Sequence, residues 1–442
     1  MLFHPMPTLR STLAVLVGCA CLAAHANDGA PDPTFGSGGM VQAGLEGTNF
    51  KAVVARPDGR VVACGSWQPN PVEYTQIVVA QFLADGTPDT GFGIGGQRLI
   101  AATSDREECT GIALQADGRV VVAGYATGGF PPGSNLTRIV ARLTTDGALD
   151  PAFAAGAGHE TFAGGLTTAL ALQNDGKILL GGYGPDASSY VFQVKRLLAD
   201  GSPDTDFGSS SLASAGFAGG STFDFGLAVA VDGSGRVIVA GTSDYYGDYR
   251  MAVARFLGNG QPDANFGDGG KVRGPAGTRG LAMAMQRDGA LVVVGTADPP
   301  PELDAAAMRV LDDGSIDDTF GDAGVARLRW IDGSDVWTTW GAAVAIQDDG
   351  RIVIAGFTEN TNTLTLGFLG RLDTHGQPDS AFANNGVETI DFANMAQPMQ
   401  ALNGVTLSSG RVVAVGDTSE VNGNRTGALA RFENDLIFAN GF

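Results

Sequence analysis

Hydrophobic and polar residues alternate along this chain in short runs, separated by turns that contain glycine. Before each turn, small and large apolar residues alternate, as in residues 169–172, 228–231, 282–285 and 343–346. After each turn comes a β-branched run, as in residues 120–122 and 352–354. No segment of useful length places apolar residues at the helical spacing of 3.6. The pattern predicts an all-β protein made of short strands.

Two signatures repeat along the chain. The first is Asp-x-x-Phe, with its phenylalanines at Phe35, Phe92, Phe153, Phe207, Phe266, Phe320 and Phe382, which are 57, 61, 54, 59, 54 and 62 residues apart. The second is a turn at Gly59, Gly118, Gly176, Gly235, Gly289, Gly350 and Gly410. Each period holds four short strands, and Asp-Gly between the first two strands indicates a tight hairpin. Seven such repeats predict a seven-bladed β-propeller with four antiparallel strands per blade, whereas a linear solenoid, the alternative, usually has shorter repeats.

The phase of the repeat predicts how the ring closes. The strand with alternating small residues is expected to be innermost, because strands crowd together at the centre of a propeller. The N-terminal segment 27–45 then holds one outer strand, and residues 400–433 hold the other three strands of the last blade. We therefore expect residues 27–45 to complete that blade, which removes two exposed sheet edges. The propeller would span residues 27–433, followed by a short tail at 434–442.

A repeated polar pair supports the same closure. In five repeats an arginine stands eight residues before the aspartate of the Phe signature: Arg142/Asp150, Arg196/Asp204, Arg255/Asp263, Arg309/Asp317 and Arg371/Asp379. Gln81 replaces the arginine before Asp89, and Arg431 has no aspartate after it. The unused aspartate is Asp32, in the N-terminal Phe signature with Phe35. We expect Asp32 and Arg431 to form the equivalent pair.

The repeats resemble those of the bacterial delta-60 repeat family, a group of exported β-propellers without an assigned activity. The residues that carry the likeness include residues 113–124 (Ala-Leu-Gln-Ala-Asp-Gly-Arg-Val-Val-Val-Ala-Gly) and residues 255–267. The resemblance covers nearly all of residues 28–433. It implies the propeller fold and supplies no catalytic residues, because the family pattern consists of turns and strands.

The N-terminus has the features of an export signal. Arg10 is the only charged residue before Asp28, an apolar stretch covers residues 13–24, and residues 24–26 (Ala-His-Ala) form a small-x-small cleavage pattern. We expect a signal peptide at 1–26 and a periplasmic or extracellular product; the alternative is a lipoprotein modified at Cys19. No later apolar run is long enough to span a bilayer. Cys64 and Cys109 remain after cleavage and are expected to form a disulfide between neighbouring blades.

Charge and composition exclude several functions. The 442 residues include 27 Lys and Arg against 47 Asp and Glu, a net charge of −20, which argues against nucleic-acid partners and anionic membranes. His159 and His375 are the only histidines after residue 26, so a Ser-His-Asp triad is not expected. Most carboxylates lie in the repeated turns, where they bond backbone amides; weak calcium binding is the alternative. We expect no catalytic residues, cofactor or metal.

Aromatic residues supply the candidate binding site. Tryptophans and tyrosines fall in or beside the loops of one face, and the candidates for ligand binding are Trp67, Tyr74, Tyr245, Tyr246, Tyr249, Trp330, Trp337 and Trp340. Aromatic rings with a polar atom suit glycans, peptides or an envelope protein; the alternative is that they anchor the loops. The sequence thus favours a monomeric, non-catalytic binding or scaffolding propeller. The alternatives are a hydrolase or lyase with a metal or acidic site at the channel mouth, and a purely structural envelope protein.

Overall fold

The computed structural model describes residues 28–70, 74–128, 135–186, 189–217, 223–298, 303–331, 337–360, 365–390, 399–419 and 425–434. The expected signal peptide at 1–26 and the alternative lipidation site at Cys19 lie outside these residues. Within them the chain is almost entirely β-strand and turn, with one short 3-10 segment at Ala154–Gly156. No helix in these ranges is long and apolar enough to cross a membrane.

Antiparallel four-stranded sheets built from consecutive strands make up most of the fold. One sheet contains β2 (Thr48–Ala55), β3 (Val61–Trp67), β4 (Gln76–Phe82) and β5 (Gln97–Ile100), and the next contains β6 (Arg106–Leu114), β7 (Val120–Gly128), β8 (Asn135–Leu143) and β9 (His159–Ala163). A later sheet contains β18 (Thr278–Met285), β19 (Leu291–Ala297), β20 (Asp304–Val310) and β21 (Val325–Leu328). The sheet after it contains β22 (Trp337–Ile346), β23 (Ile352–Asn360), β24 (Thr365–Leu372) and β25 (Val387–Ile390). The first two strands of each sheet are joined by the Gly turn that the sequence repeats.

A larger sheet lies between these groups. It contains β10 (Leu166–Leu172), β11 (Ile178–Asp186), β12 (Ser189–Leu197), β13 (Leu212–Ala215), β14 (Phe223–Val231), β15 (Val237–Tyr245), β16 (Asp248–Phe256) and β17 (Lys271–Arg273). Its two halves are each antiparallel and are joined by a single parallel bridge between Tyr190 and Phe223. Apart from that bridge, each half has the strand order of the four-stranded sheets.

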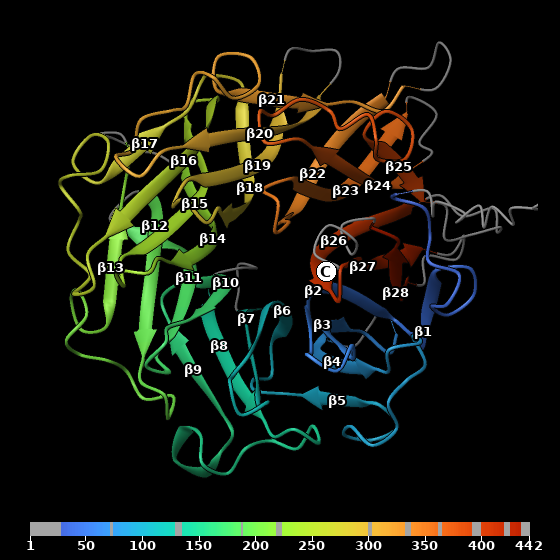
Figure 1. Cartoon of the computed structure of the whole chain (residues 1–442). Helices are drawn as coiled ribbons and strands as arrows, with labels where there is room; N and C mark the ends of the chain where they lie inside the picture. The colour runs from blue at the N-terminus through green and yellow to red at the C-terminus, as the bar shows by residue number, and fades with distance from the viewer. Residues whose placement is uncertain are drawn as a thin grey trace, which may run out of the picture.

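The sheets are arranged around a common centre (Figure 1). The first strand of each group is the innermost, and each contacts the first strand of the next: β2 with β6, β6 with β10, β10 with β14, β14 with β18, β18 with β22. The innermost strand of the last sheet, β26 (Met399–Ser408), contacts both β22 and β2. The small side chains of these strands allow this close approach, as the alternating pattern predicts.

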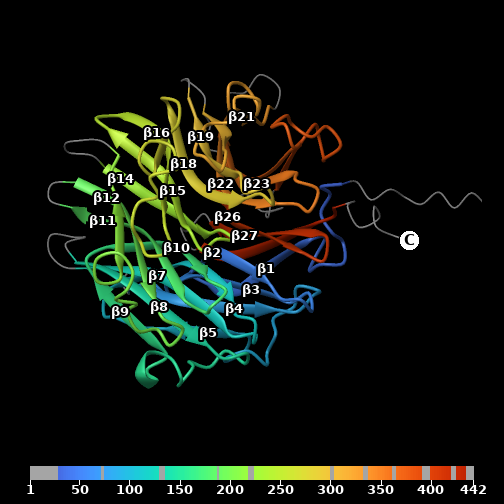
Figure 2. The ribbon, with the colours of Figure 1, turned by 60° about the vertical axis from the view of Figure 1, so that its left-hand side comes forward.

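The two ends of the chain share one sheet. β1 (Met40–Glu46) pairs with β28 (Arg425–Phe432), which pairs with β27 (Arg411–Ser419) and, through it, with β26. Figure 2 shows the N-terminal strand, in blue, beside the C-terminal strands, in red. Upstream of β1, Asp28 forms an ion pair with the buried Arg371 at 2.5 Å. Asn434, which we placed in the tail, is buried and accepts a hydrogen bond from Arg371.

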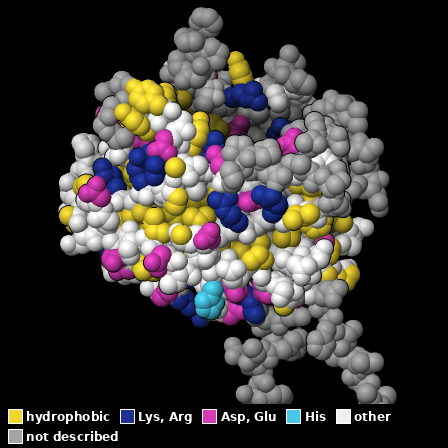
Figure 3. Space-filling model, turned by 90° about the horizontal axis from the view of Figure 1, so that it is seen from above, with side chains coloured by type: hydrophobic (Ala, Val, Ile, Leu, Met, Phe, Trp, Pro, Cys, Tyr) yellow, Lys and Arg dark blue, Asp and Glu magenta, His cyan; other side chains and the backbone are white. Residues whose placement is uncertain are grey.

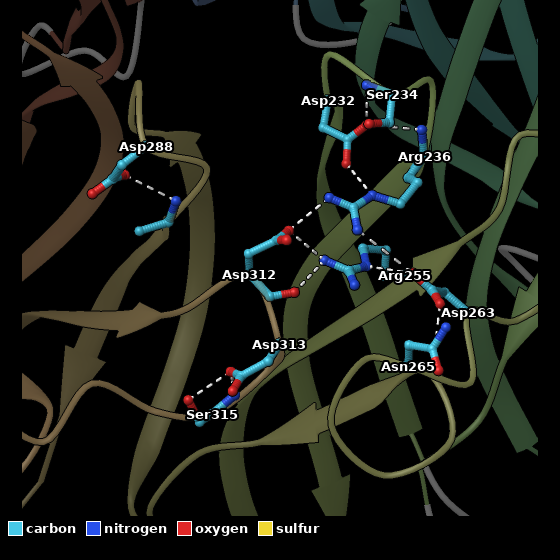
Figure 4. A network of polar contacts seen from close by, with 11 residues as sticks. Asp232, Ser234, Arg236, Arg255, Asp263, Asn265, Asp288, Asp312, Asp313 and Ser315 are labelled. Atoms are coloured by element: carbon cyan, nitrogen blue, oxygen red, sulfur yellow. Dashed lines mark hydrogen bonds and ion pairs between the residues drawn. The ribbon is translucent and has the colours of Figure 1, made fainter.

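Buried or half-buried arginines link neighbouring sheets and the two halves of the eight-stranded sheet. In the five in-chain pairs the arginine Nε lies 2.7–2.8 Å from the aspartate Oδ2, and the guanidinium lies over the ring of the Phe signature. The Nη1 atom of Arg255 also donates to the Asp312 carbonyl in a turn of the neighbouring sheet, at 2.6 Å (Figure 4). Equivalent bonds join Arg142 to Ala199, Arg196 to Gly258 and Arg309 to Thr374.

The same contacts occur between the two ends of the chain. Arg431 Nε donates to Asp32 Oδ2 at 2.6 Å, the guanidinium lies over Phe35, and Nη1 donates to the carbonyl of Ala84 in the first sheet. This is the geometry that the repeat spacing predicts for Asp32 and Arg431, although 399 positions separate them. Where Gln81 replaces the arginine, Arg56 bonds its side chain and reaches the neighbouring sheet at Gly118.

A disulfide joins two neighbouring sheets inside the core. Cys64 in β3 and Cys109 in β6 are bonded, with their Cα atoms 5.9 Å apart, and both residues are fully buried. They are the pair that the sequence analysis names. Both lie in the middle of their strands.

Candidate ligand-binding cavity

Each innermost strand contains one β-bulge at an equivalent position. The pairing of the first two strands of every sheet shifts by one residue, which leaves one residue outside the ladder: Lys51, Thr110, Thr168, Leu227, Leu281, Ala342 and Asn403. A glycine of the second strand faces each bulge. At Gly65, for example, a Cβ atom would lie 1.8 Å from the carbonyl oxygen of Asn49. The bulge therefore requires glycine in that strand, since the two backbones approach too closely for a side chain.

The bulge residues all line one central cavity of about 660 Å³. A bulge releases a residue from the alternation of a strand and redirects its side chain. Glu108 of β6, Tyr125 of β7 and Tyr183 of β11 also line the cavity. Its size lies within the usual range for ligand sites, roughly 300–1,000 Å³.

The cavity wall has a polar side and an apolar side. The polar bulge residues, Asn403, Lys51, Thr110 and Thr168, lie on four strands that follow one another around the centre: β26, β2, β6 and β10. The apolar bulge residues, Leu227, Leu281 and Ala342, lie on β14, β18 and β22. The cavity therefore suits a ligand with hydrogen-bonding groups along one edge.

Three of the polar bulge residues bond the neighbouring innermost strand. Thr110 Oγ1 donates to the Thr167 carbonyl at 2.8 Å, and Thr168 Oγ1 donates to the Gly226 carbonyl at 2.7 Å. Asn403 Nδ2 donates to the carbonyl of Phe50 at 3.0 Å. These side chains hold the wall together, and Lys51 and Glu108 are the charged residues that line it.

Tyrosine and aspartate side chains shape the electrostatics of the polar side. Tyr125 donates its hydroxyl to Glu108 Oε2 at 2.9 Å, and burial together with the Glu108 charge raises the pKa of Tyr125. Tyr125 therefore stays protonated and orients the carboxylate. Behind the wall, burial raises the pKa of Asp417, while Arg425 and Lys51 oppose that rise. Asn403 Nδ2 lies 3.2 Å from Asp417 Oδ1.

An aromatic cluster extends from the cavity toward the surface. Tyr183 contacts Phe225 and Tyr190 edge-on, with ring centroids 5.0 and 5.9 Å apart. Phe223 stacks on Tyr190 at 6.1 Å and on Phe225 at 6.5 Å. The side chain at the outer end, Phe223, is 47% exposed.

The aromatic residues proposed from the sequence lie elsewhere. None of the eight lines the central cavity, although all eight are among the described residues. Tyr74, Tyr245 and Tyr246 are exposed, and the last two contact each other at 4.8 Å. Tyr249 lies under the guanidinium of Arg279, and Trp67 donates its indole N–H to the Glu46 carbonyl at 3.0 Å.

The three remaining tryptophans pack against the protein itself. Trp340 stacks on Phe357 at 5.6 Å, and Trp330 packs against the core cluster that contains Phe320. Trp337 is only 3% exposed, so its side chain is not presented to a ligand. We placed Trp337 and Trp340 in or beside a loop, whereas both belong to β22, which begins at Trp337.

None of the residues that line the cavity is among the binding candidates named from the sequence. Glu108 lies near the start of the innermost strand β6, and Tyr125 and Tyr183 come from the second strands of their sheets. The signal that was available is the glycine within each second strand, such as Gly65, which indicates a bulge opposite it. Among the described residues no group of three or more His, Cys, Asp and Glu could hold a metal ion.

Comparison with a family model agrees with this architecture. Residues 56–92, 115–153, 173–207, 233–266, 347–382 and 407–436 each match the model described as "Domain of unknown function (DUF5122) beta-propeller". The chain is a β-propeller repeat protein. No curated protein matches it. The matched segments of this propeller each run from a Gly turn to a Phe signature or, in the last case, past the end of β28.

Solved structures with a similar fold are distant in sequence. A protein of unknown function from Dyadobacter fermentans is 12% identical, with 90% of this chain and 99% of that chain covered and a TM-score of 0.45. The polysaccharide lyase Uly1 is 10% identical, with 95% and 94% covered and a TM-score of 0.46. The sialidase of Trypanosoma rangeli is 8% identical, with 87% and 55% covered and a TM-score of 0.41. These likenesses concern the fold alone.

The comparison corrects one expectation from the sequence. From the sequence we favoured a non-catalytic protein and kept a hydrolase or lyase as the alternative; that preference is contradicted, since the structures of similar fold include a polysaccharide lyase and a sialidase. Both a binding role and an enzymatic role are compatible with the fold.

Proposed function

We propose that this protein is an exported seven-bladed β-propeller of the delta-60 repeat type that binds a ligand in its central cavity. The blade count is supported by the eight-stranded sheet, whose halves meet only at the Tyr190–Phe223 bridge and otherwise resemble the other sheets. Closure of the ring by the N-terminal strand is supported by the pairing of β1 with β28 and by the contact of β26 with β2.

Export is supported by the sequence of residues 1–26 and by the disulfide. Disulfides persist in oxidising compartments and are rare in the cytosol. The Cys64–Cys109 bond lies in the core between two blades, where it contributes to the stability of the fold. Periplasmic and extracellular locations both satisfy this requirement.

The observation that carries the binding proposal is the polar side of the cavity. Lys51, Glu108 and Tyr125 bring an ammonium, a carboxylate and a hydroxyl to one wall, opposite Leu227 and Leu281. Convergent polar groups in an otherwise apolar pocket are typical of small-molecule sites. The surface drawn in Figure 3 has Lys and Arg side chains interspersed with Asp and Glu, which is unlike the basic patch of a nucleic-acid site.

Binding measurements on two cavity variants test this proposal. The mature protein is screened against glycans, peptides and envelope proteins, and each hit is titrated by calorimetry against Lys51→Ala and Glu108→Gln. We expect both variants to weaken a true cavity ligand at least tenfold. The control is Lys177→Ala, because Lys177 lies next to a Gly turn, where it pairs with Asp175, and does not line the cavity. A ligand that binds all variants equally well contradicts the cavity assignment, and product analysis in the same titrations detects turnover.

A further inference from the structure

The aromatic cluster beside the cavity has a position that packing alone does not explain. Tyr183 belongs to β11, and Phe225 belongs to β14 of the next blade, so the cluster crosses the boundary between two blades. At its outer end Phe223 leaves 47% of its surface exposed, although it begins an innermost strand. The position of Tyr183 is held by Ser66, Thr242 and Thr296 in three other blades, whereas Tyr125 and Phe357 hold it in two more. The repeat therefore does not require aromatic rings here.

The four rings form a continuous path from the cavity to the exterior. Tyr183 lines the cavity, Phe225 and Tyr190 contact Tyr183, and Phe223 stacks on both of them. The path begins beside the polar wall, where Glu108 and Lys51 offer hydrogen-bonding groups. A ligand that uses both features must present polar groups to the wall and apolar faces to the rings.

We propose that the cavity binds the end of a neutral oligosaccharide whose following sugar rings lie along the path Tyr183–Phe225–Phe223. This inference rests on the proposed cavity site. A pyranose ring carries hydroxyl groups at its edge and C–H groups on its face, and it matches a polar wall followed by aromatic faces. A polyanionic chain is disfavoured because the protein carries a net charge of −20 and the rings bring no cation to the path.

Chain length is the variable that tests the path. Cello-oligosaccharides and N-acetylated chito-oligosaccharides, from dimers to hexamers, are titrated into the full mature protein by calorimetry. We expect affinity to rise with length in at least one series. Phe223→Ala should weaken the longer members by roughly five- to tenfold, the value of one aromatic contact, and leave the shortest binder within twofold. Lys51→Ala should weaken all members.

Two controls separate folding from binding. Tyr246→Ala removes an exposed ring that is 79% exposed and lies outside the path, so it should leave every affinity unchanged. Phe223→Leu keeps an apolar side chain but removes the ring. It should weaken the binding of the longer oligosaccharides as much as Phe223→Ala does, while its melting temperature stays that of the parent.

The outcomes distinguish this inference from the proposed function. If Lys51→Ala weakens binding but Phe223→Ala and Phe223→Leu have no length-dependent effect, the path is wrong and the cavity site stands. If no neutral oligosaccharide of either series binds, while a ligand of another class depends on Lys51, the inference is likewise overturned. If nothing that binds depends on Lys51 or Glu108, both proposals fail.

Discussion

Removing the Asp32 carboxylate should destabilise the protein as strongly as removing its counterpart within a single blade. Asp32 is fully buried and accepts hydrogen bonds from Arg431 Nε at 2.6 Å, from Thr34 N at 2.9 Å and from Thr34 Oγ1 at 2.7 Å. Arg411 forms a further ion pair with it at 2.9 Å. Asp32→Ala leaves the guanidinium of Arg431, which is 9% exposed, without its carboxylate.

The size of the effect follows from the burial of the pair. Breaking a buried ion pair by removing one partner costs about 3–5 kcal/mol, because the remaining charge is left uncompensated. At about 2.1 cal/mol/K of unfolding entropy per residue, this corresponds to a fall in melting temperature of roughly 3–6 °C for a domain of this length. Because large domains often unfold irreversibly, the comparison is made at one scan rate.

A matched variant decides whether the closure pair is equivalent to an in-chain pair. Asp204→Ala breaks the Arg196–Asp204 pair, which has the same geometry within continuous chain. Calorimetry should show a shift for Asp204→Ala and a shift at least as large for Asp32→Ala, because Asp32 also pairs with Arg411. Deleting residues 28–46 should cost far more, because it also removes the β1–β28 ladder. The closure scheme is refuted if the deletion variant melts at the same temperature as the parent. It is also refuted if Asp204→Ala lowers the melting temperature and Asp32→Ala does not.

Three further predictions follow from single contacts. Replacing both Cys64 and Cys109 by alanine should cost about 4 kcal/mol, as expected for a closed loop of 45 residues, and intact mass spectrometry should find no free thiol in the parent. Burial alone would raise the pKa of Asp32, but its hydrogen bonds and the charge of its arginine partner place it below the ordinary 3.8. The contribution of Asp32 to stability is therefore fully present above pH 3.8 and is lost as the pH falls through the lower pKa of the folded state. The measurement is the melting temperature as a function of pH, which should change less for Asp32→Asn than for the parent. Trp337→Ala should cost about 3–5 kcal/mol and Tyr246→Ala less than about 0.5 kcal/mol, and equal melting temperatures would contradict the difference in burial.

The repeat made the arrangement of strands predictable. Three features of the repeat involve residues that are close in sequence: the arginine with the aspartate eight residues later, the Phe signature and the Gly turn. Each recurs often enough to show which strand of a repeat comes first. The order β1-β28-β27-β26 follows from that phase, because the N-terminal segment contains the one strand that the last repeat lacks. The pairing of Asp32 with Arg431 follows in the same way, since it continues a spacing that five other pairs display.

The residues of the candidate site could not be read from the same pattern. Which side chains of an innermost strand face the centre depends on the bulge, since one extra residue moves every later side chain to the opposite face. Lys51 and Asn403 reach the cavity because they are the extra residues. Trp337 illustrates a second limit: the sequence places it in or beside a loop, which agrees with its position at the start of β22, but gives no sign that its side chain is buried.

The bulge also explains why chemistry can vary at the cavity while the ring is preserved. The arginine, the aspartate and the Phe signature are constrained by contacts with the neighbouring blade, and the glycine opposite the bulge is constrained by the close approach of two backbones. The bulge residue itself has no partner in the register of the two strands, and lysine, threonine, leucine and alanine all occur there. Differences among the repeats at this position therefore alter the wall of the cavity with little effect on the sheets. The polar side formed by Lys51 and its neighbours is one result of these differences, and in the proposed function it is the side that recognises the ligand.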